Sequence, residues 1–231
     1  MSSPPPSSIA YFLADHSARI PHLYASALPL NERTGVDLIN GRLSELASYV
    51  DDFRAAVALF EFATAEVGHP MEYVENPEDA RKRDGIRRWR HIAARDGAMT
   101  IFHFGETLDA LRGGFKDCPA LRVLVDTEAL KGADKAFDIS FPNYVRLRHS
   151  VAHQTQVAAA PFLSMRNDNG PQIIITGSLA GRRFESIWNG HPVSYSIGEP
   201  ALNELAAIRD QVFAGFTSAE MTLRSRLPEH P

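Results

Sequence analysis

The feature that most constrains the fold of this chain is one long run of regularly spaced apolar residues. The spacing alternates between four and three residues, at Ile39, Leu43, Leu46, Val50, Phe53, Val57, Phe60 and Val67, with Thr64 in the one gap. Because an α-helix has about 3.6 residues per turn, this spacing places these side chains along one face of a single helix. The pattern therefore predicts an amphipathic helix over residues 36–67, which Gly68 and Pro70 end.

Four further helices are predicted from apolar spacing and from the proline and glycine residues near their ends. They cover about residues 77–112, 119–137 with an interruption at Gly132, 142–158, and 200 to just before Pro228. Proline stands in the first turn of each, where the missing backbone N–H costs no hydrogen bond, and Gly113-Gly114 follows the first of them. Helices therefore dominate the predicted chain.

The periodicity changes late in the sequence. Residues 172–176, 182–188 and 193–197 are short segments rich in β-branched and aromatic side chains, separated by Gly177–Gly181 and Asn189-Gly190. Asn-Gly between two such segments is typical of a tight hairpin turn. We therefore predict a small antiparallel meander over about residues 172–197, with a loop over residues 159–171 before it.

Because the predicted strands occur in one late segment only, they indicate an insertion in a helical bundle rather than an alternating sheet fold. The predicted fold is mainly α, an up-and-down bundle of about five helices with the meander before the C-terminal helix. Residues 1–34 are predicted to be a flexible N-terminal segment. Residues 35–231 are predicted to form the bundle as one domain.

The composition excludes several functional classes. The chain has 231 residues and 44% hydrophobic content, so it can bury a core, and its formal net charge of −4 excludes a generally basic nucleic-acid coat. Its single cysteine, Cys118, cannot form an internal disulfide, which is typical of a reducing compartment. No run reaches roughly 18 apolar residues, and the N-terminus lacks the charge pattern of a signal peptide. We expect a cytoplasmic protein that does not span a membrane.

The segment most suggestive of chemistry is Arg148-His149-Ser150-Val151-Ala152-His153, inside the predicted helix 142–158. A guanidinium is a fixed cation whose fork of donors suits phosphate oxygens, and an imidazole has an unperturbed pKa close to neutrality. Arginine, a polar residue, three more residues and histidine form a motif that resembles the HEPN superfamily of helical bundles. Such a pair can act on a phosphate without a metal or another cofactor.

The resemblance implies a metal-independent endoribonuclease that works as a homodimer, with one motif from each subunit facing a shared cleft. In that family pattern His153 takes the proton of the ribose 2′-hydroxyl, Arg148 stabilises charge on the phosphate, and His149 positions RNA or shares proton transfer. Roles of this kind need a base with a pKa near the working pH and a preorganised cation. The resemblance also implies a role in toxin–antitoxin or defence systems, with an antitoxin as partner.

Helical geometry complicates the choice of arginine. At about 100° per residue, Arg146, His149, Ser150 and His153 cluster on one face, whereas Arg148 falls on the opposite stripe with Tyr144, Leu147 and Val151. A guanidinium on an inward stripe needs a carboxylate partner. We therefore keep Arg146 as a supporting residue and expect Arg148 to reach either the cleft or an acid.

Three polar residues of the predicted helix 77–112 are candidates for that support. Asp96, His103 and Glu106 fall within about 80° of one another among apolar neighbours. One acid could hold Arg148, and the other could orient His149 or His153 as a carboxylate does for a catalytic imidazole. A solvated polar strip is the alternative interpretation of the same spacing.

The same predicted helix begins with a strongly basic stretch. Residues 81–95 carry seven cations and one acid, Asp84, a local charge of +6, and Trp89 offers a stacking face. The candidate RNA-binding residues are Arg83, Arg87, Arg88, Trp89 and Arg90. Phosphate contacts of this type position nucleic acid without reading its sequence, although acidic residues just upstream could also neutralise the patch.

Two alternatives to RNA cleavage stay open. The first is a non-catalytic bundle that binds a partner protein or a nucleotide through the same cleft. The second is a metal-binding bundle, since His149 and His153 at i and i+4 have metal-ligand spacing. The chain lacks the glutamate of a zinc-protease helix, and it has neither a glycine-rich phosphate loop nor a serine nucleophile elbow. We assign no metal ligands.

Overall fold

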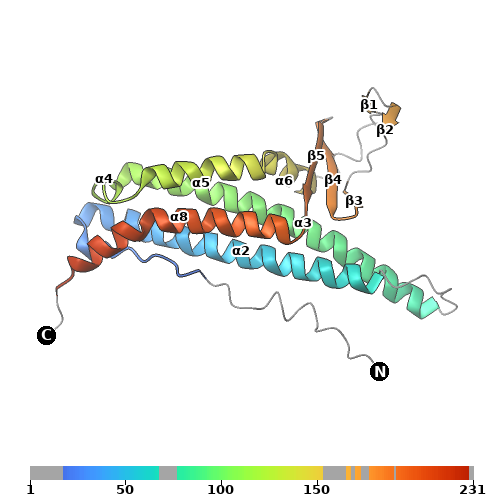
Figure 1. Cartoon of the computed structure of the whole chain (residues 1–231), viewed down its shortest axis with the longest axis horizontal. Helices are drawn as coiled ribbons and strands as arrows, with labels where there is room; N and C mark the ends of the chain where they lie inside the picture. The colour runs from blue at the N-terminus through green and yellow to red at the C-terminus, as the bar shows by residue number, and fades with distance from the viewer. Residues whose placement is uncertain are drawn as a thin grey trace. The chain divides into compact units, whose positions relative to one another are not determined.

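The computed structural model describes residues 18–67, 77–152, 165–167, 170–172, 177–189 and 191–228. Within these residues the protein is mainly α-helical, with a small antiparallel sheet before the C-terminal helix, which confirms the predicted fold class (Figure 1). The α-helices are α2 (Arg33–Val67), α3 (Pro77–Gly114), α4 (Pro119–Arg122), α5 (Thr127–Ser140), α6 (Tyr144–Ala152) and α8 (Glu199–Ser225). Short 3₁₀ helices are η1 (Ala25–Ala27), η2 (Leu30–Glu32) and η3 (Phe115–Asp117).

The boundaries of α2, α3 and α8 follow the predicted ones closely, but the third predicted helix breaks elsewhere. Gly132 lies inside α5, and the break falls before Asp126, whose carboxylate accepts hydrogen bonds from Glu128 N and Ala129 N as the N-cap of α5. A Cβ on Gly132 would lie 2.5 Å from Gln211 Nε2. The glycine therefore allows a close approach between helices instead of ending one.

The meander consists of β3 (Ser178–Ala180), β4 (Arg183–Trp188) and β5 (His191–Ser196), paired antiparallel in that order. The pairing of Trp188 with His191 leaves two residues between β4 and β5, and the positive φ of 48° at Asn189 is typical of a tight hairpin turn. Of the predicted first strand, residues 172–176, Gln172 ends a short strand and residues 173–176 lie outside the described residues, while the first strand of the meander is Ser178–Ala180.

A second hairpin occupies part of the predicted loop 159–171. Strands β1 (Met165–Asn167) and β2 (Gly170–Gln172) pair antiparallel, with Asn167 opposite Gly170. The polar composition of this segment predicted a loop, but a hairpin ladder satisfies backbone groups whatever the side chains are. The loop prediction is therefore corrected for residues 165–167, 170 and 171.

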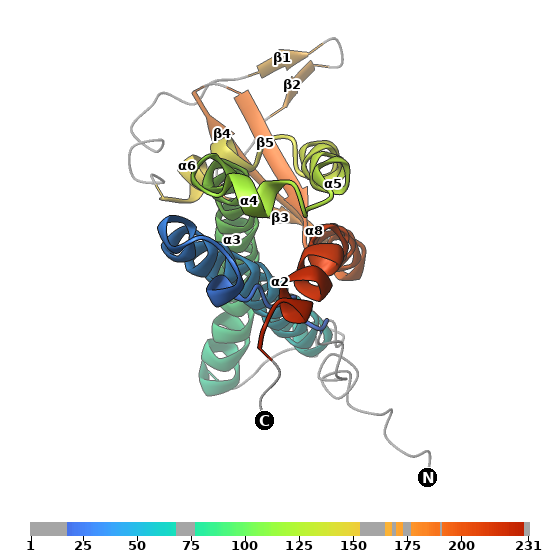
Figure 2. The ribbon, with the colours of Figure 1, turned by 90° about the vertical axis from the view of Figure 1, so that its left-hand side faces the viewer.

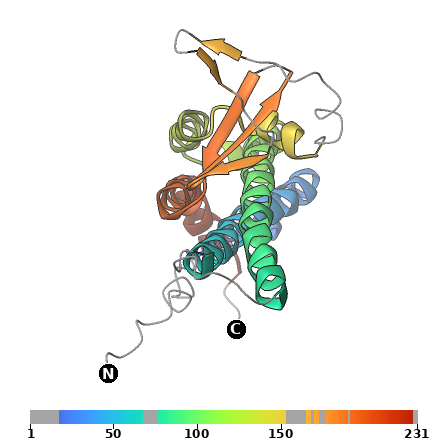
Figure 3. The ribbon, with the colours of Figure 1, turned by 90° about the vertical axis from the view of Figure 1, so that its right-hand side faces the viewer.

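By internal contacts the chain divides into two compact units, and we describe each separately. The sheet unit contains residues 52–102 and 143–202, and the helical unit contains residues 16–51, 103–142 and 203–231. Each contains a part of α2, of α3 and of α8. Figure 2 shows α4 and α5 of the helical unit, and Figure 3 shows the antiparallel sheet of the sheet unit.

The helical unit is built around stacked aromatic side chains. Phe104 of α3 stacks with Phe137 of α5 at 5.6 Å between ring centroids, and Phe115 of η3 stacks with Phe216 of α8 at 5.9 Å. All four rings are buried, so these pairs contribute both apolar burial and favourable ring geometry.

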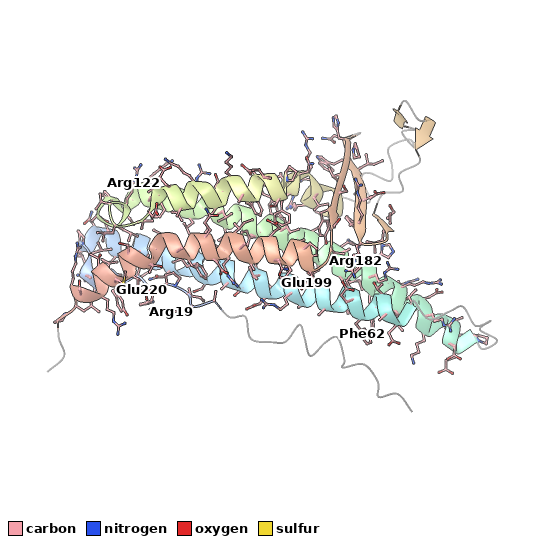
Figure 4. The ribbon with its side chains drawn as sticks, viewed as in Figure 1. Arg19, Phe62, Arg122, Arg182, Glu199 and Glu220 are labelled. Carbon is pink, nitrogen blue, oxygen red and sulfur yellow. The ribbon has the colours of Figure 1, made fainter. Side chains whose placement is uncertain are left out.

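Residues 18–34 correct the prediction of a flexible N-terminal segment. Leu23 and Leu28 are buried, and the backbone of Leu23 exchanges two hydrogen bonds with the Asn40 side chain, at 2.9 and 2.8 Å. Arg19 pairs with the buried Glu220 of α8 at 2.7 Å, and both residues are labelled in Figure 4. The polar composition of residues 1–8 suggested flexibility, but the apolar residues further along pack on the unit.

In the sheet unit the turn between β3 and β4 is attached to two helices. The guanidinium of Arg182, labelled in Figure 4, makes a two-pronged ion pair with Glu61 of α2, with 2.9 Å between Nη2 and Oε2. Arg90 of α3 donates to the carbonyl of Gly181 at 3.1 Å. These contacts position the meander against α2 and α3.

A second attachment explains why residue 97, inside α3, is a glycine. The Tyr195 hydroxyl donates to the Ala94 carbonyl, and a Cβ on Gly97 would lie 2.6 Å from that hydroxyl oxygen and 3.1 Å from Phe53 Cε2. Burial, followed by the charge of Asp96, raises the pKa of Tyr195, so the phenol stays protonated and remains a donor. Glycine is required here because the tyrosine occupies the space of a side chain.

We expect Gly97→Ala to lower the free energy of unfolding by about 1–2 kcal/mol, because overpacking outweighs the better helix propensity of alanine. In a Tyr195→Phe background the clashing oxygen is absent, so the same change should cost clearly less. Urea unfolding of the two single variants and the double variant measures this difference. An identical cost of Gly97→Ala in both backgrounds would contradict the packing explanation.

Candidate active site on helix α6

Helix α6 is attached to the sheet unit by its apolar residues. Leu147 and Val151 are buried, and α6 packs against β4 and β5. Ser150 is fully buried at 0% exposure, and its hydroxyl donates to the Leu147 carbonyl at 2.7 Å. Helical spacing grouped Ser150 with the polar face of this helix, but in the structure Ser150 is buried because α6 packs against the sheet.

The first two residues of the motif, Arg148 and His149, contact each other. Arg148 Nη1 lies 3.2 Å from His149 Nδ1, and the guanidinium lies over the ring of Phe102, 5.3 Å from its centroid. An arginine can only donate, so His149 Nδ1 is the acceptor and a neutral His149 ring carries its proton on Nε2. Helical spacing had placed these side chains on different faces, but the long arginine side chain reaches across that angle.

One buried polar atom of Arg148 is unsatisfied within the described part of the chain. Its Nε is buried and has no hydrogen-bond partner there. Asp96, the acid of the sheet unit that could have paired with Arg148, forms no ion pair with it in the described residues. The guanidinium charge is thus placed against an aromatic face, where attraction is weaker than to a carboxylate.

Trp188 at the end of β4 completes the arrangement. Its ring stacks on the imidazole of His149 at 5.0 Å between centroids, with 16° between the planes. Stacking limits rotation of the imidazole and keeps Nδ1 directed at Arg148. Sequence reasoning missed Trp188 and Phe102, because both reach the site from other elements and neither is near the motif in the chain.

The remaining predicted residues are distributed differently. His153 lies outside the described residues, and Arg146 is exposed on α6. Asp96 is exposed, yet partial desolvation and, next, the charge of Asp52 raise the pKa of its carboxyl. His103 and Glu106 belong to the helical unit, where His103 stacks with Tyr49 at 5.9 Å and Glu106 is exposed. The structure thus brings together Arg148 and His149 of the predicted group.

The basic stretch of α3 is only partly available at the surface. Arg90 is half-buried: besides its bond to Gly181, its guanidinium lies over the ring of Phe60, 5.3 Å from the centroid. Arg90 therefore has structural contacts within the sheet unit, and its role in RNA binding stays a prediction. Arg87 and Arg88 are exposed, Arg83 is half-buried, and Trp89 is 42% exposed.

The described residues contain neither a metal-binding group of side chains nor a helix able to cross a membrane. No group of three or more histidine, cysteine, aspartate or glutamate side chains there could hold a metal ion. None of the helices in the described ranges combines the length and the apolar content that crossing a membrane demands. In comparisons with known proteins, no family model, no curated protein and no solved structure matches this chain.

Proposed function

We propose that this protein is a HEPN-like endoribonuclease that cleaves RNA without a metal, with Arg148 stabilising the reacting phosphate and His153 as general base. The observation that carries the proposal is the state of Arg148. Its guanidinium contacts His149 Nδ1 and an aromatic ring, and its buried Nε has no hydrogen-bond partner in the described residues. A partly enclosed cation of this kind gains most from an anion that arrives as ligand, and phosphate matches its fork of donors.

The contact between Arg148 and His149 supports different roles for His149 and His153. Because His149 Nδ1 accepts from the guanidinium, the neutral ring offers Nε2–H as a donor and has no free nitrogen to act as base. His149 therefore positions Arg148 and donates to RNA. The role of base falls to His153, four residues further along the sequence.

The proposed reaction is an internal transfer at one phosphodiester. His153 takes the proton of the 2′-hydroxyl while O2′ forms a bond to phosphorus, and the bond from phosphorus to the 5′-oxygen of the next nucleotide breaks. The leaving oxygen takes a proton from water. The products are a 2′,3′-cyclic phosphate and a 5′-hydroxyl. Arg148 stabilises the added negative charge on the phosphoryl oxygens.

Incubation of the purified chain with RNA in the presence of EDTA tests the proposal. We expect cleavage with cyclic-phosphate ends, and we expect His153→Ala to slow it by about 100-fold or more, as loss of a general base does. Arg122→Ala, at an exposed position of α4 labelled in Figure 4, is a control for substitutions at basic residues. Equal rates for wild type and His153→Ala would contradict the proposal.

A second candidate function is a non-catalytic bundle that binds a partner. It is favoured by the enclosure of Arg148 and His149 between Phe102 and Trp188, since the same contacts join α6 to α3 and β4. In that case His153→Ala changes no RNA-cleaving activity and the motif serves stability. The homodimer and the antitoxin partner belong to the first proposal, and light scattering of the purified chain measures the dimer.

A further inference from the structure

The exposed part of the basic stretch forms a distinct surface on α3. Arg81, Arg88 and Arg95 follow one another at seven-residue spacing, and all three are exposed. Seven residues are nearly two helical turns, so these side chains form one stripe, with about 10 Å between successive Cα atoms. The stripe lies opposite the buried Ala93, Ala94 and Gly97, which attach α3 to the unit. Its charges therefore face solvent.

An aromatic platform lies beside this stripe. Trp89 of α3 stacks with Phe62 of α2, labelled in Figure 4, at 6.1 Å between centroids with 28° between the rings. Phe62 is half-buried, whereas Trp89 and the nearby Ile92 are 42% and 55% exposed. An indole that is supported on one side and open on the other presents a flat π-face to a ligand.

We infer that α3 carries a site for single-stranded nucleic acid, in which the arginine stripe contacts phosphates and Trp89 stacks on a base. Phosphates complement the cations, and every base has a flat face that fits an aromatic platform without sequence preference. Paired bases in a duplex are stacked on each other and cannot stack on Trp89, so the surface selects single strands.

The inference deepens the proposed function and rests on it in one respect: RNA is the relevant strand because α6 is proposed to cleave RNA. Phe102, which contacts Arg148, lies on the same helix about 21 Å along the axis from Arg88. A strand of several nucleotides held on the stripe can therefore extend to α6 within the sheet unit. The surface would bind nucleotides of the substrate that lie several positions along the strand from the phosphate being cleaved.

Binding is tested apart from cleavage with a fluorescent 2′-O-methyl RNA 20-mer, which lacks the attacking hydroxyl. We expect the full chain to bind the single strand at low salt, and to bind the duplex at least tenfold more weakly. We expect Trp89→Ala to raise Kd about tenfold, while Trp89→Phe retains most affinity. Arg81→Ala with Arg88→Ala should reduce the slope of log K against log salt by about 1.4, because two phosphate contacts are lost.

The controls separate this inference from its alternatives. Arg122→Ala should bind like wild type, and unchanged thermal unfolding of Trp89→Ala shows that the fold is intact. Wild-type affinity in both Trp89→Ala and the double arginine variant would overturn the inference, and so would equal affinity for duplex. A polyglutamate peptide that binds as tightly as RNA, with the same dependence on Trp89, would assign the surface to an acidic protein instead. Binding without cleavage would contradict the proposed function but not this site.

Discussion

Replacing Arg148 by methionine is expected to slow RNA cleavage by about 100- to 1000-fold, the effect of removing one preorganised charge-stabilising group. Methionine can keep an apolar stem over Phe102 while it removes the guanidinium, so the packing of α6 on α3 should largely persist. Arg148→Lys keeps a charge but loses the forked donors and the contact geometry to His149, so an intermediate rate is expected. Single-turnover cleavage of a labelled RNA measures all three proteins.

The matched control is Arg146→Ala on the same helix. Arg146 is exposed, whereas Arg148 contacts His149, so we expect the Arg146 variant to change the rate less than about threefold. This comparison decides between the two arginines that the sequence could not separate. A greater loss for Arg146→Ala than for Arg148→Met would contradict the assignment. Thermal unfolding of each variant distinguishes lost chemistry from lost structure.

The second large effect is expected at Glu32, in the helical unit. This glutamate is 3% exposed, and its carboxylate accepts hydrogen bonds from Ala120 N at 3.1 Å and Leu121 N at 3.4 Å. It therefore satisfies the otherwise unpaired N–H groups in the first turn of α4, where a negative charge is favourable. Charge-assisted hydrogen bonds in a buried site are among the stronger ones.

We expect Glu32→Ala to lower the free energy of unfolding by about 2–4 kcal/mol, because it leaves two buried N–H groups without a partner. Glu32→Gln keeps one acceptor oxygen and should lose less. Glu66→Ala, at an exposed glutamate of α2, should change the free energy of unfolding by less than about 0.5 kcal/mol. Urea unfolding followed by circular dichroism compares them, and equal midpoints for Glu32→Ala and Glu66→Ala would refute the remote cap.

The fold could be predicted where its determinants are local. Apolar spacing in the sequence gave α2 and α3 to within three residues, because helical periodicity is a property of neighbouring residues. The turn at Asn189 was predictable for the same reason, because its signal is a local pair of residues. Glycine was less reliable, since Gly97 and Gly132 lie inside helices where a partner side chain approaches the backbone. Nothing nearby in the sequence distinguishes such a glycine from one that ends a helix.

The candidate site was only partly predictable. The motif identified Arg148 and His149, but their contact with each other and with Phe102 and Trp188 depends on how α6 packs against α3 and β4. The same limit applies to Arg90. In the sequence it is one residue of the basic stretch, whereas in the structure it donates to the β3–β4 turn and lies over Phe60.

The sequence alone thus determined the helical class, the long helices, the late meander and the identity of the motif, because each follows from patterns within a few turns of chain. The tertiary structure decided which charged side chains are enclosed and which remain exposed. Burial and pairing depend on segments that are far apart in sequence, such as Glu32 with Ala120 or Arg90 with Gly181. The contacts of Arg148 with His149 and Phe102 are a property of that second kind.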